Sequence, residues 1–368
     1  MTNRFNHARN DEPSMPTHAK YNDSRDTCHL KIVIIVSEFH PSIGGMQILA
    51  EMLARQFSLI GHDVFVVTNT PAATPDSFPF TVARCRHFQA IFSLCKTADV
   101  VLAVGFSLKM MIPSLIARRP VVVHHPNPIA SKTGALRLRD RLKLRLTRGT
   151  TNIVPSSFMA SVLPNSIVIP NPYNDRLFQY HGEAKPKDLV FVGRLARVKG
   201  VDTLLNALRE FSTRNPISLT IVGDGPERAS LESLSRQLGL SSQVTFVGSK
   251  HGEDLASTIR EHKVMVVPSL YKEPFGIVAL EGLASGCLLI VSRDGGLLDA
   301  TGTHALAFEN GNSASLAHCL ATAFGDDPGN MRMLQDVRKH LARHSEATIA
   351  ERYLVVMKGA LAARVDAQ

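Results

Sequence analysis

Two glutamates that stand eight residues apart, Glu273 and Glu281, form the most specific chemical pattern in the chain. Glu273 begins the sequence Glu-Pro-Phe-Gly, whose proline and glycine favour a turn, so that a helix can begin near Ile277. The first carboxylate would lie in the turn and the second about one to two turns into the helix. Eight fully helical residues would rise about 12 Å, and with a turn included the gap between the carboxylates shrinks to about the span from a hexose to a nucleotide ribose. Amides at the helix start would face an anion between the carboxylates. The alternative is a pair of solvated surface glutamates.

Two cations follow an apolar run, Leu189–Gly193, that is typical of a strand. Arg194 comes directly after this run, and Lys199 comes five residues later, before a glycine. Arginine offers a planar fork and lysine a point charge, a combination that suits a diphosphate. Gly44 and Gly45 stand at the equivalent point of the first half of the chain, where backbone amides could approach a phosphate. The alternatives are ordinary surface cations and a plain tight turn.

The glycine pair must be carried by a strand, a helix and a second strand. The aliphatic, β-branched run 30–36 is typical of a strand buried on both faces. Apolar residues then recur with helical spacing over 46–60, Gly61 ends that helix, and the next strand begins at 64–67. This order is a βαβ unit. Further buried strands are expected at Val100–Val104, Pro120–Val123 and Thr151–Val154.

The same pattern restarts in the second half of the chain. Three prolines, Pro164, Pro170 and Pro172, crowd a stretch that suits an interdomain connection. After the strand at 189–193 we expect helices over 201–211, 226–238, 253–261 and 277–284, and strands over 218–222, 244–247, 264–267 and 288–291. This alternation predicts two doubly wound α/β domains with mainly parallel sheets. A ligand should bind in the cleft between them, at the carboxyl ends of the strands.

The composition fits a globular protein. Of the 368 residues, 44% are hydrophobic and 20% charged, and no run reaches the roughly 18 apolar residues that a spanning helix needs. The first residues include no apolar block of the kind that a signal peptide has. The five cysteines form no CxxC pair, so we expect reduced thiols and a cytoplasmic location. The net charge is +9, but the excess is too local to indicate general nucleic-acid binding.

Taken in order, these motifs resemble those of the retaining GT-B glycosyltransferases of family 4, also called group 1. The shared pieces are Gly44-Gly45, Gly193-Arg194 with Lys199-Gly200, Gly223-Asp224-Gly225-Pro226, Val244–Gly248, and Glu273-Pro274-Phe275-Gly276 with Glu281. The resemblance covers roughly residues 30–365. It implies a GT-B architecture, in which two Rossmann-like domains face a central cleft. It also implies transfer of a sugar from a nucleotide diphosphate donor to an acceptor hydroxyl, with the anomeric configuration kept.

The resemblance also implies roles for the charged residues. Arg194 and Lys199 would clamp the donor pyrophosphate and stabilise charge on the departing nucleotide, an electrostatic contribution that commonly dominates catalysis. Glu273 would hydrogen-bond the donor sugar near its reacting face. Glu281 would hold the ribose hydroxyls.

Backbone groups complete the expected donor site. Phe275 and Gly276 would offer amides to the sugar or phosphate, and Gly44 or Gly45 would close on the β-phosphate from the first domain. The base would contact the backbone near Gly248–Lys250.

A histidine at the end of a first-domain strand often lies beside the acceptor in this family. Here the strand at 120–123 is followed by His124 and His125, and the register does not decide between them. We take His124 as the catalytic candidate. A capping or core histidine is the alternative.

The sequence departs from the family pattern at two places. A late Gly295-Gly296 pair is followed by Asp299, where the family commonly has a glutamate, and Gln47 stands where a carboxylate usually follows the first glycine pair. The chain has no Asp-x-Asp triplet, which transferases of the other major fold use to hold a divalent ion on the diphosphate. Because cationic side chains can replace that ion, we expect no required metal or other cofactor.

Basic residues are concentrated in the segment Leu136–Arg148, which holds six cations against Asp140. Leucines alternate with the cations as in a strand, yet Leu138, Leu142 and Leu146 also form a helical stripe. The family places a helix here, and we expect one. It could lie on an anionic membrane surface and bring the protein to a lipid-linked acceptor. An ordinary surface helix with solvated arginines is the alternative.

Four segments are expected along the chain. These are a disordered tail over 1–28, an acceptor domain over 29–168, a nucleotide-sugar donor domain over 169–335, and C-terminal helices over 336–368, the last of which packs back on the first domain.

Cell-surface polysaccharide or glycolipid synthesis is the expected setting. A GT-B epimerase or phosphorylase and a non-catalytic sugar-nucleotide sensor are competing hypotheses. A dehydrogenase is disfavoured because the first glycine pair does not complete a GxGxxG fingerprint.

Overall fold

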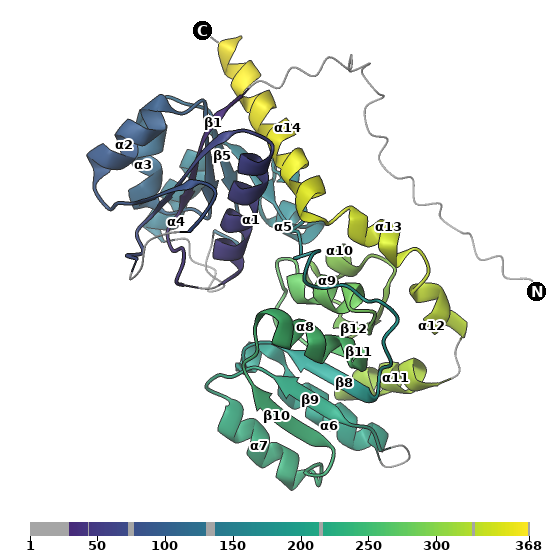
Figure 1. Cartoon of the computed structure of the whole chain (residues 1–368). Coiled ribbons are helices and arrows are strands. Elements are labelled where there is room, and N and C mark those ends of the chain that lie inside the picture. The colour runs from purple at the N-terminus through teal and green to yellow at the C-terminus, as the bar shows by residue number, and fades with distance from the viewer. Residues whose placement is uncertain are drawn as a thin grey trace, which may run out of the picture.

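The computed structural model describes residues 29–42, 44–72, 77–129, 137–212, 216–325 and 328–366. The expected tail over 1–28 lies outside these residues, as does Leu136, the first residue of the basic segment. Within the described ranges the chain forms two α/β domains, and the C-terminal helix returns from the second domain to the first (Figure 1). The prediction of two doubly wound parallel domains is confirmed.

The first domain contains a seven-stranded sheet in the order β3-β2-β1-β4-β5-β6-β7, in which all paired strands are parallel. Its strands are β1 Lys31–Val36, β2 Asp63–Thr68, β3 Thr81–Arg84, β4 Val100–Val104, β5 Val121–His124, β6 Thr151–Val154 and β7 Ile167–Val168. Its helices are α1 Gly45–Leu59, α2 Phe88–Thr97, α3 Leu108–Ile116, α4 Leu138–Thr147 and α5 Ser157–Val162.

The second domain contains a six-stranded parallel sheet in the order β10-β9-β8-β11-β12-β13. Its strands are β8 Lys187–Val192, β9 Leu219–Val222, β10 Val244–Gly248, β11 His262–Val267, β12 Leu288–Ser292 and β13 Ala305–Phe308. Its helices are α6 Val201–Ser212, α7 Arg228–Gln237, α8 Gly252–Arg260, α9 Ile277–Ala284, α10 Leu297–Thr301 and α11 Ser313–Phe324. The chain ends in α12 Pro328–Met333, α13 Val337–Ala342 and α14 Glu346–Val365.

The central strand β1 explains why the sequence reads as a continuous aliphatic run. Ile32 and Ile34 face a core layer formed with α1 and α14, whereas Val33 and Ile35 face a layer formed with α2 and α3. Alternate side chains of a strand point to opposite faces, so a strand covered on both sides needs apolar residues at every position. Helix α14 completes the first of these layers, with Tyr353 fully buried against the sheet.

Several elements of the structure had not been expected from the sequence. Strands β3, β7 and β13 and helices α2, α3 and α5 are added to the predicted set. Segment 138–147 is helical as expected, but its leucine stripe does not face the core. Leu138 is 83% exposed and Leu142 is 44% exposed, whereas Asp140 is buried. Among the described residues no helix combines the length and apolar character that crossing a membrane requires.

Candidate active site

Glu273 lies in the loop between β11 and α9, and its side chain is almost fully buried. One carboxylate oxygen, Oε1, accepts hydrogen bonds from Lys199 Nζ at 2.7 Å and from Ser269 Oγ at 2.6 Å. The other, Oε2, accepts a hydrogen bond from the hydroxyl of Tyr271. Three donors stabilise the negative charge of this buried carboxylate and fix its orientation. The structure thus brings together Glu273 and Lys199, two residues predicted for one site from 74 positions apart.

Gly200 explains how the lysine is brought to the loop of Glu273. Its φ of 66° is left-handed, and a Cβ there would lie 1.9 Å from the carbonyl oxygen of Pro268. Only glycine allows this approach, because every other residue would clash with the backbone. The amide of Leu270 then donates to the carbonyl of Val198 at 2.9 Å. The turn that carries Lys199 is therefore packed directly on the loop that follows β11.

Arg194 lies in the turn after β8, where the sequence analysis placed it. The turn is tied to the end of β9 by the amide of Gly193, which donates to Val222, and by the amide of Leu195, which donates to Asp224. The side chain of Arg194 is exposed, and no hydrogen-bond or ion-pair partner for it is found in the described part of the chain. Its positive charge is thus available to a ligand, whereas that of Lys199 is balanced by Glu273.

A cavity of about 640 Å³ lies between the two domains and contains two of the predicted donor residues. Gly45 lines it from α1 of the first domain, and Glu281 lines it from α9 of the second. His251 and Gly252, at the start of α8, form another part of its wall. Burial raises the pKa of Glu281 to about 7 from an ordinary value of 4.5. This carboxyl group therefore changes protonation near neutral pH.

Backbone donors are also present near Glu273. Among the described residues, the amides of Phe275 and Gly276 have no hydrogen-bond acceptor. They precede α9, so the positive end of the helix adds to their attraction for an anion. Phe275 itself is buried and supports the loop from the core. Gly44, at the start of α1, also lies at a helix N-terminus.

The predicted base-binding segment follows β10. Gly248 has a left-handed φ of 75°, and its carbonyl accepts a hydrogen bond from the amide of Gly223 at 2.8 Å. Lys250 Nζ lies 2.8 Å from Thr258 Oγ1, so this ammonium group is turned toward α8. The side chain of Lys250 is thereby occupied, and the segment offers mainly backbone to a ligand.

His124 and His125 point to opposite sides of the first sheet. His124 is fully buried, and its Nδ1 lies 2.8 Å from the hydroxyl of Tyr353 on α14. Burial lowers the pKa of His124 to about 3, so its ring is neutral at physiological pH. Its Nε2 is buried without a partner in the described part of the chain. The preferred candidate of the sequence analysis thus lies in the core, against the C-terminal helix.

His125, the other candidate, lines two small cavities of about 230 and 210 Å³. Its Nε2 lies 2.9 Å from Oδ1 of Asn152. The amide nitrogen of Asn152 donates to the carbonyls of Thr147 and Thr150, so Oδ1 must be an acceptor. We therefore assign the proton of His125 to Nε2, which leaves the Nδ1 lone pair unpaired among the described residues. Lys143 of α4 lines the first of these cavities.

Burial lowers the pKa of His125 below its ordinary value of 6.5. The hydrogen bond with Asn152 opposes this effect, and the nearby charge of Lys143 reinforces it. The ring is therefore neutral at pH 7 and can accept a proton at Nδ1.

Ser269 and Tyr271, which fix the carboxylate of Glu273, had not been expected from the sequence. Their only signal is their position, four and two residues before the glutamate on the same loop. Asp299, which marks one of the two departures from the family pattern, accepts a hydrogen bond at 2.9 Å from the amide of Ser157 in the first domain. This contact joins the two domains.

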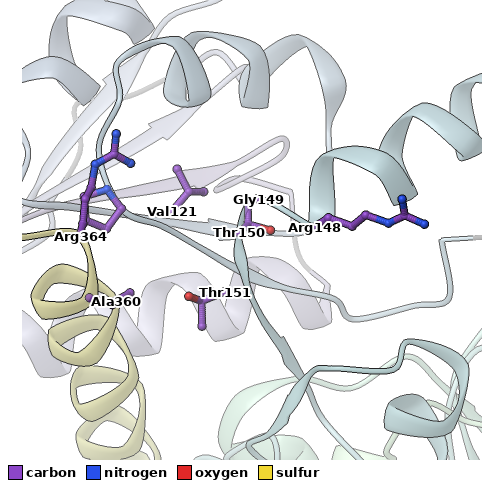
Figure 2. Close-up of a pocket in the computed structure, with 9 residues that line it drawn as sticks. Val121, Arg148, Gly149, Thr150, Thr151, Ala360 and Arg364 are labelled. Carbon is purple, nitrogen blue, oxygen red and sulfur yellow. The ribbon is translucent and has the colours of Figure 1, made fainter. Parts of the chain in front are cut away.

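A separate cavity of about 500 Å³ lies at the opposite end of the first sheet, beside the amino ends of β5 and β6. Arg148 and Arg364 contribute to its lining, and Figure 2 shows them on opposite sides of the view. It contains none of the predicted site residues. Within the described residues, no group of three or more histidine, cysteine, aspartate or glutamate side chains is placed to hold a metal ion.

Comparisons with known sequences place these motifs in a wider group. Residues 174–340 match the family described as glycosyl transferases group 1. An uncharacterized glycosyltransferase of Methanocaldococcus jannaschii is 42% identical over 113 residues, 31% of this chain and 29% of that protein. The D-inositol 3-phosphate glycosyltransferase of Corynebacterium efficiens is 32% identical over 189 residues, 49% of this chain and 44% of that protein. The matches thus span less than half of these curated relatives.

Solved structures extend the likeness to both domains. Anabaena HepE in complex with UDP and glucose has a TM-score of 0.75, with 19% identity, and the match covers 90% of this chain and 100% of that one. At that identity the likeness shows the fold. These comparisons support the glycosyltransferase group that the order of the motifs indicates. Residues 174–340 carry the sequence pattern of the group 1 glycosyltransferases, and the chain as a whole has the GT-B fold.

Proposed function

We propose that this protein transfers a sugar from a nucleotide diphosphate sugar to an acceptor hydroxyl and retains the anomeric configuration. One observation carries the proposal: Lys199 meets the buried Glu273 at the carboxyl ends of the strands of the second domain. A cation beside a carboxylate serves both parts of such a donor, because the cation attracts the diphosphate and the carboxylate accepts hydrogen bonds from the sugar.

The leaving group would be stabilised by charge that is already in place. Arg194 is exposed, and no described residue compensates its charge; Lys199 lies close enough to Glu273 to be shared between the carboxylate and a phosphate. The free amides of Phe275 and Gly276 add two donors. Because these groups are fixed before the reaction, they stabilise the negative charge that develops on the departing nucleotide without reorganisation.

The nucleoside would occupy the interdomain cavity. Glu281 lines this cavity and would accept hydrogen bonds from the ribose hydroxyls. The start of α8, with His251 and Gly252, lies on the same wall and follows the predicted base-binding segment Gly248–Lys250. Gly45, on the other wall, would bring the amides at the start of α1 to the phosphates. Binding there would draw the two domains together.

His125, rather than His124, is the residue that we place beside the acceptor. The sequence favoured His124, but its ring is buried against Tyr353. His125 is equally buried, but it lines a cavity at the carboxyl ends of the strands, and its Nδ1 has no partner among the described residues. A neutral imidazole in this position can accept a hydrogen bond from the acceptor hydroxyl as that hydroxyl attacks.

We further propose that no divalent metal is required. Arg194, Lys199 and the helix-start amides provide the positive potential that a metal would supply in other transferases. The test is sugar transfer after extensive treatment with a chelator. Undiminished turnover supports the proposal. Loss of turnover that manganese restores would contradict it.

A membrane-associated setting is proposed from α4. Leu138 and Leu142 are exposed beside Arg139, Arg141 and Arg145 on this short helix. Apolar and cationic groups on one exposed helix suit the surface of an anionic bilayer. We therefore place the protein on the inner face of the membrane, where it would build a polysaccharide or glycolipid from a saccharide or lipid-linked acceptor.

The proposed function is tested in two steps. A thermal-shift screen against UDP-, GDP-, ADP- and dTDP-sugars should reveal one nucleotide class, because a ligand that binds the folded state raises the melting temperature. Nuclear magnetic resonance of the product formed from that donor then reports the anomeric configuration. Release of a free sugar isomer or phosphate-dependent cleavage without an acceptor would instead support an epimerase or a phosphorylase.

A further inference from the structure

The loop that carries Glu273 is in direct contact with the first domain through Ser156. This serine is fully buried, and its Oγ accepts a hydrogen bond from the amide of Met159, which makes it the N-cap of α5. The same hydroxyl lies 2.6 Å from the carbonyl oxygen of Pro274. Because a carbonyl can only accept, the proton of Ser156 must be donated to Pro274. A single hydroxyl therefore both caps a helix of one domain and binds the catalytic loop of the other.

The opposite side of this loop is held by the second domain itself. The amide of Gly296 donates to the carbonyl of Glu273 at 2.7 Å. A Cβ on Gly296 would lie 2.3 Å from the carbonyl oxygen of Pro274 and 2.9 Å from the Cβ of Ser156. No larger residue fits there without displacing one of them. The Glu273-Pro274 backbone is thus enclosed between Gly296 of its own domain and Ser156 of the other.

A second bond joins the domains one residue further along. Asp299, in the first turn of α10, accepts a hydrogen bond at 2.9 Å from the amide of Ser157. Ser156 and Asp299 therefore connect the start of α5 to both the loop of Glu273 and helix α10. The side chain of Ser157 is exposed, and only its amide takes part in the contact.

We propose that Ser156 and Asp299 are positioning residues that set the Glu273 loop when the two domains meet. The inference rests on the proposed function, since it assigns a role in the turnover of the sugar nucleotide. Arg194, Lys199 and Glu281, the side chains assigned to the bound nucleotide, lie outside the segment that Ser156 holds. The amides of Phe275 and Gly276 follow Pro274 directly, but they are assigned to the charge that develops as the nucleotide departs, so their displacement also lowers kcat. Glu273, by contrast, is one residue from the carbonyl that Ser156 holds. Loss of the contact should therefore disturb the sugar more than the nucleotide.

The expected signature is a fall in kcat with little change in nucleotide affinity. Ser156→Ala leaves the carbonyl of Pro274 without its donor, and a shift of the loop by about 1 Å can lower turnover about 100-fold. We expect kcat to fall about 10- to 100-fold, while the donor KM and the Kd of the nucleoside diphosphate stay within about twofold. A general loss of structure would change all three quantities together.

The experiment compares four variants with the wild type. These are Ser156→Ala, Asp299→Ala, Asp299→Asn and the control Ser157→Ala. Asp299→Asn keeps an oxygen that can accept from the amide of Ser157, so it should retain turnover that Asp299→Ala loses. Ser157→Ala should resemble the wild type. The assay measures hydrolysis and transfer with UDP-glucose and binding of UDP, or their counterparts from the thermal-shift screen, together with the melting temperature of each variant.

The outcomes separate this inference from the proposed function. If the wild type consumes no sugar nucleotide, the proposed function is wrong and the positioning role is lost with it. If the wild type turns over but Ser156→Ala and Asp299→Ala keep its kcat, the positioning role alone is wrong. The same holds if UDP binding falls in proportion to kcat. Should Ser156→Ala fail to fold, the Asp299 pair still decides, since Asp299→Asn keeps the acceptor oxygen for the amide of Ser157 that Asp299→Ala removes.

Discussion

The ammonium group of Lys199 lies 2.7 Å from Oε1 of Glu273, and the two residues come from loops that follow different strands of one parallel sheet. The pair sits where the carboxyl ends of β8 and β11 meet, which is the position at which ligands bind in folds of this type. Ser269 and Tyr271 donate to the same carboxylate, so it would keep two donors if the lysine turned to a phosphate. Under the proposed function, Lys199 would be shared between the carboxylate of Glu273 and a phosphate of the donor.

Removing either cation should lower sugar transfer strongly. We expect Lys199→Ala and Arg194→Ala each to lower kcat/KM by about 100- to 1,000-fold, the effect typical of losing one group that stabilises an oxyanion. Glu273→Ala should have a similar effect, because the donor sugar loses its hydrogen-bond acceptor. Steady-state kinetics with the donor that the screen identifies measures each effect.

Lys272→Ala is the matched control, since Lys272 is exposed and directly precedes Glu273. Circular dichroism should show an unchanged fold for all four variants. Near-normal transfer by Lys199→Ala, Arg194→Ala and Glu273→Ala together would show that the site lies elsewhere.

Glu281 should make both stability and donor binding depend on pH. Its pKa is raised to about 7 by burial, so the folded protein holds a proton that the unfolded chain loses near pH 4.5. The resulting contribution to stability is full below about pH 4.5 and is lost as the pH rises through about 7. Glu281→Gln cannot ionise, so it should melt at a higher temperature than the wild type at pH 8 and at a similar temperature at pH 4.5.

The same variant should bind the nucleotide more weakly at pH 8, because a carboxylate accepts hydrogen bonds from two ribose hydroxyls better than an amide does. Isothermal titration with UDP and melting curves at the two pH values test both statements. A variant that melts below the wild type at pH 8 would contradict the assignment of the raised pKa.

The sequence was sufficient for the elements around the site because local patterns decide them. The run at 30–36 is aliphatic throughout since β1 is covered on both faces, and Gly200 is required where the backbone passes close to Pro268. The edge strand β3 was missed because its residues are only partly buried and have no such pattern. Contacts between distant residues escaped for a different reason. The residues around Ser156 contain no pattern that predicts its contact with Pro274, which is 118 positions away.

The sequence also could not decide whether His124 or His125 faces the cavity, because the two residues are adjacent. A strand places successive side chains on opposite faces, so a one-residue uncertainty in where β5 ends exchanges core and cavity. His124 takes the face covered by α14, which is the last helix of the chain and cannot be placed from the strand's own sequence. Tyr353 and Asn152, which distinguish the two rings, are both distant in sequence from Val121–Val123.

His125→Ala should therefore lower transfer to the acceptor, whereas His124→Ala should mainly lower stability. In the first variant the acceptor loses the Nδ1 atom, but the donor site in the second domain is intact, so slow hydrolysis of the donor should continue. In the second variant the hydroxyl of Tyr353 is left buried without its partner. Measuring transfer and hydrolysis side by side, with melting temperatures, separates the two effects.

The pH profile gives an independent check on this assignment. Because the pKa of His125 lies below 6.5, its ring stays neutral and able to accept a proton as the pH falls from 8 to 6.5. Titration of His125 should therefore cause no loss of wild-type transfer as the pH falls from 8 to 6.5. Any loss in that range should also be present in the residual transfer by His125→Ala. A decline that His125→Ala abolishes would show that the pKa of His125 is not lowered. Loss of transfer by His124→Ala at unchanged stability would instead exchange the roles of the two rings.

Helix α4 should bind anionic bilayers through its exposed leucines and arginines. The apolar groups of Leu138 and Leu142 are exposed at 83% and 44%, and cations flank them on the same helix. Binding of the wild type to vesicles that contain phosphatidylglycerol should exceed binding to phosphatidylcholine vesicles and should weaken as salt screens the charges. Leu138→Asp with Leu142→Asp should abolish it, because the substitution removes the apolar anchor and adds repulsion.

Val355→Asp is the control, since Val355 is equally apolar and 66% exposed but lies on α14. Each variant should keep its turnover with a soluble acceptor, because α4 contributes only Lys143 and Leu144 to the cavities beside His125. Equal sedimentation of the double variant and the wild type with anionic vesicles would assign α4 to an ordinary solvated surface.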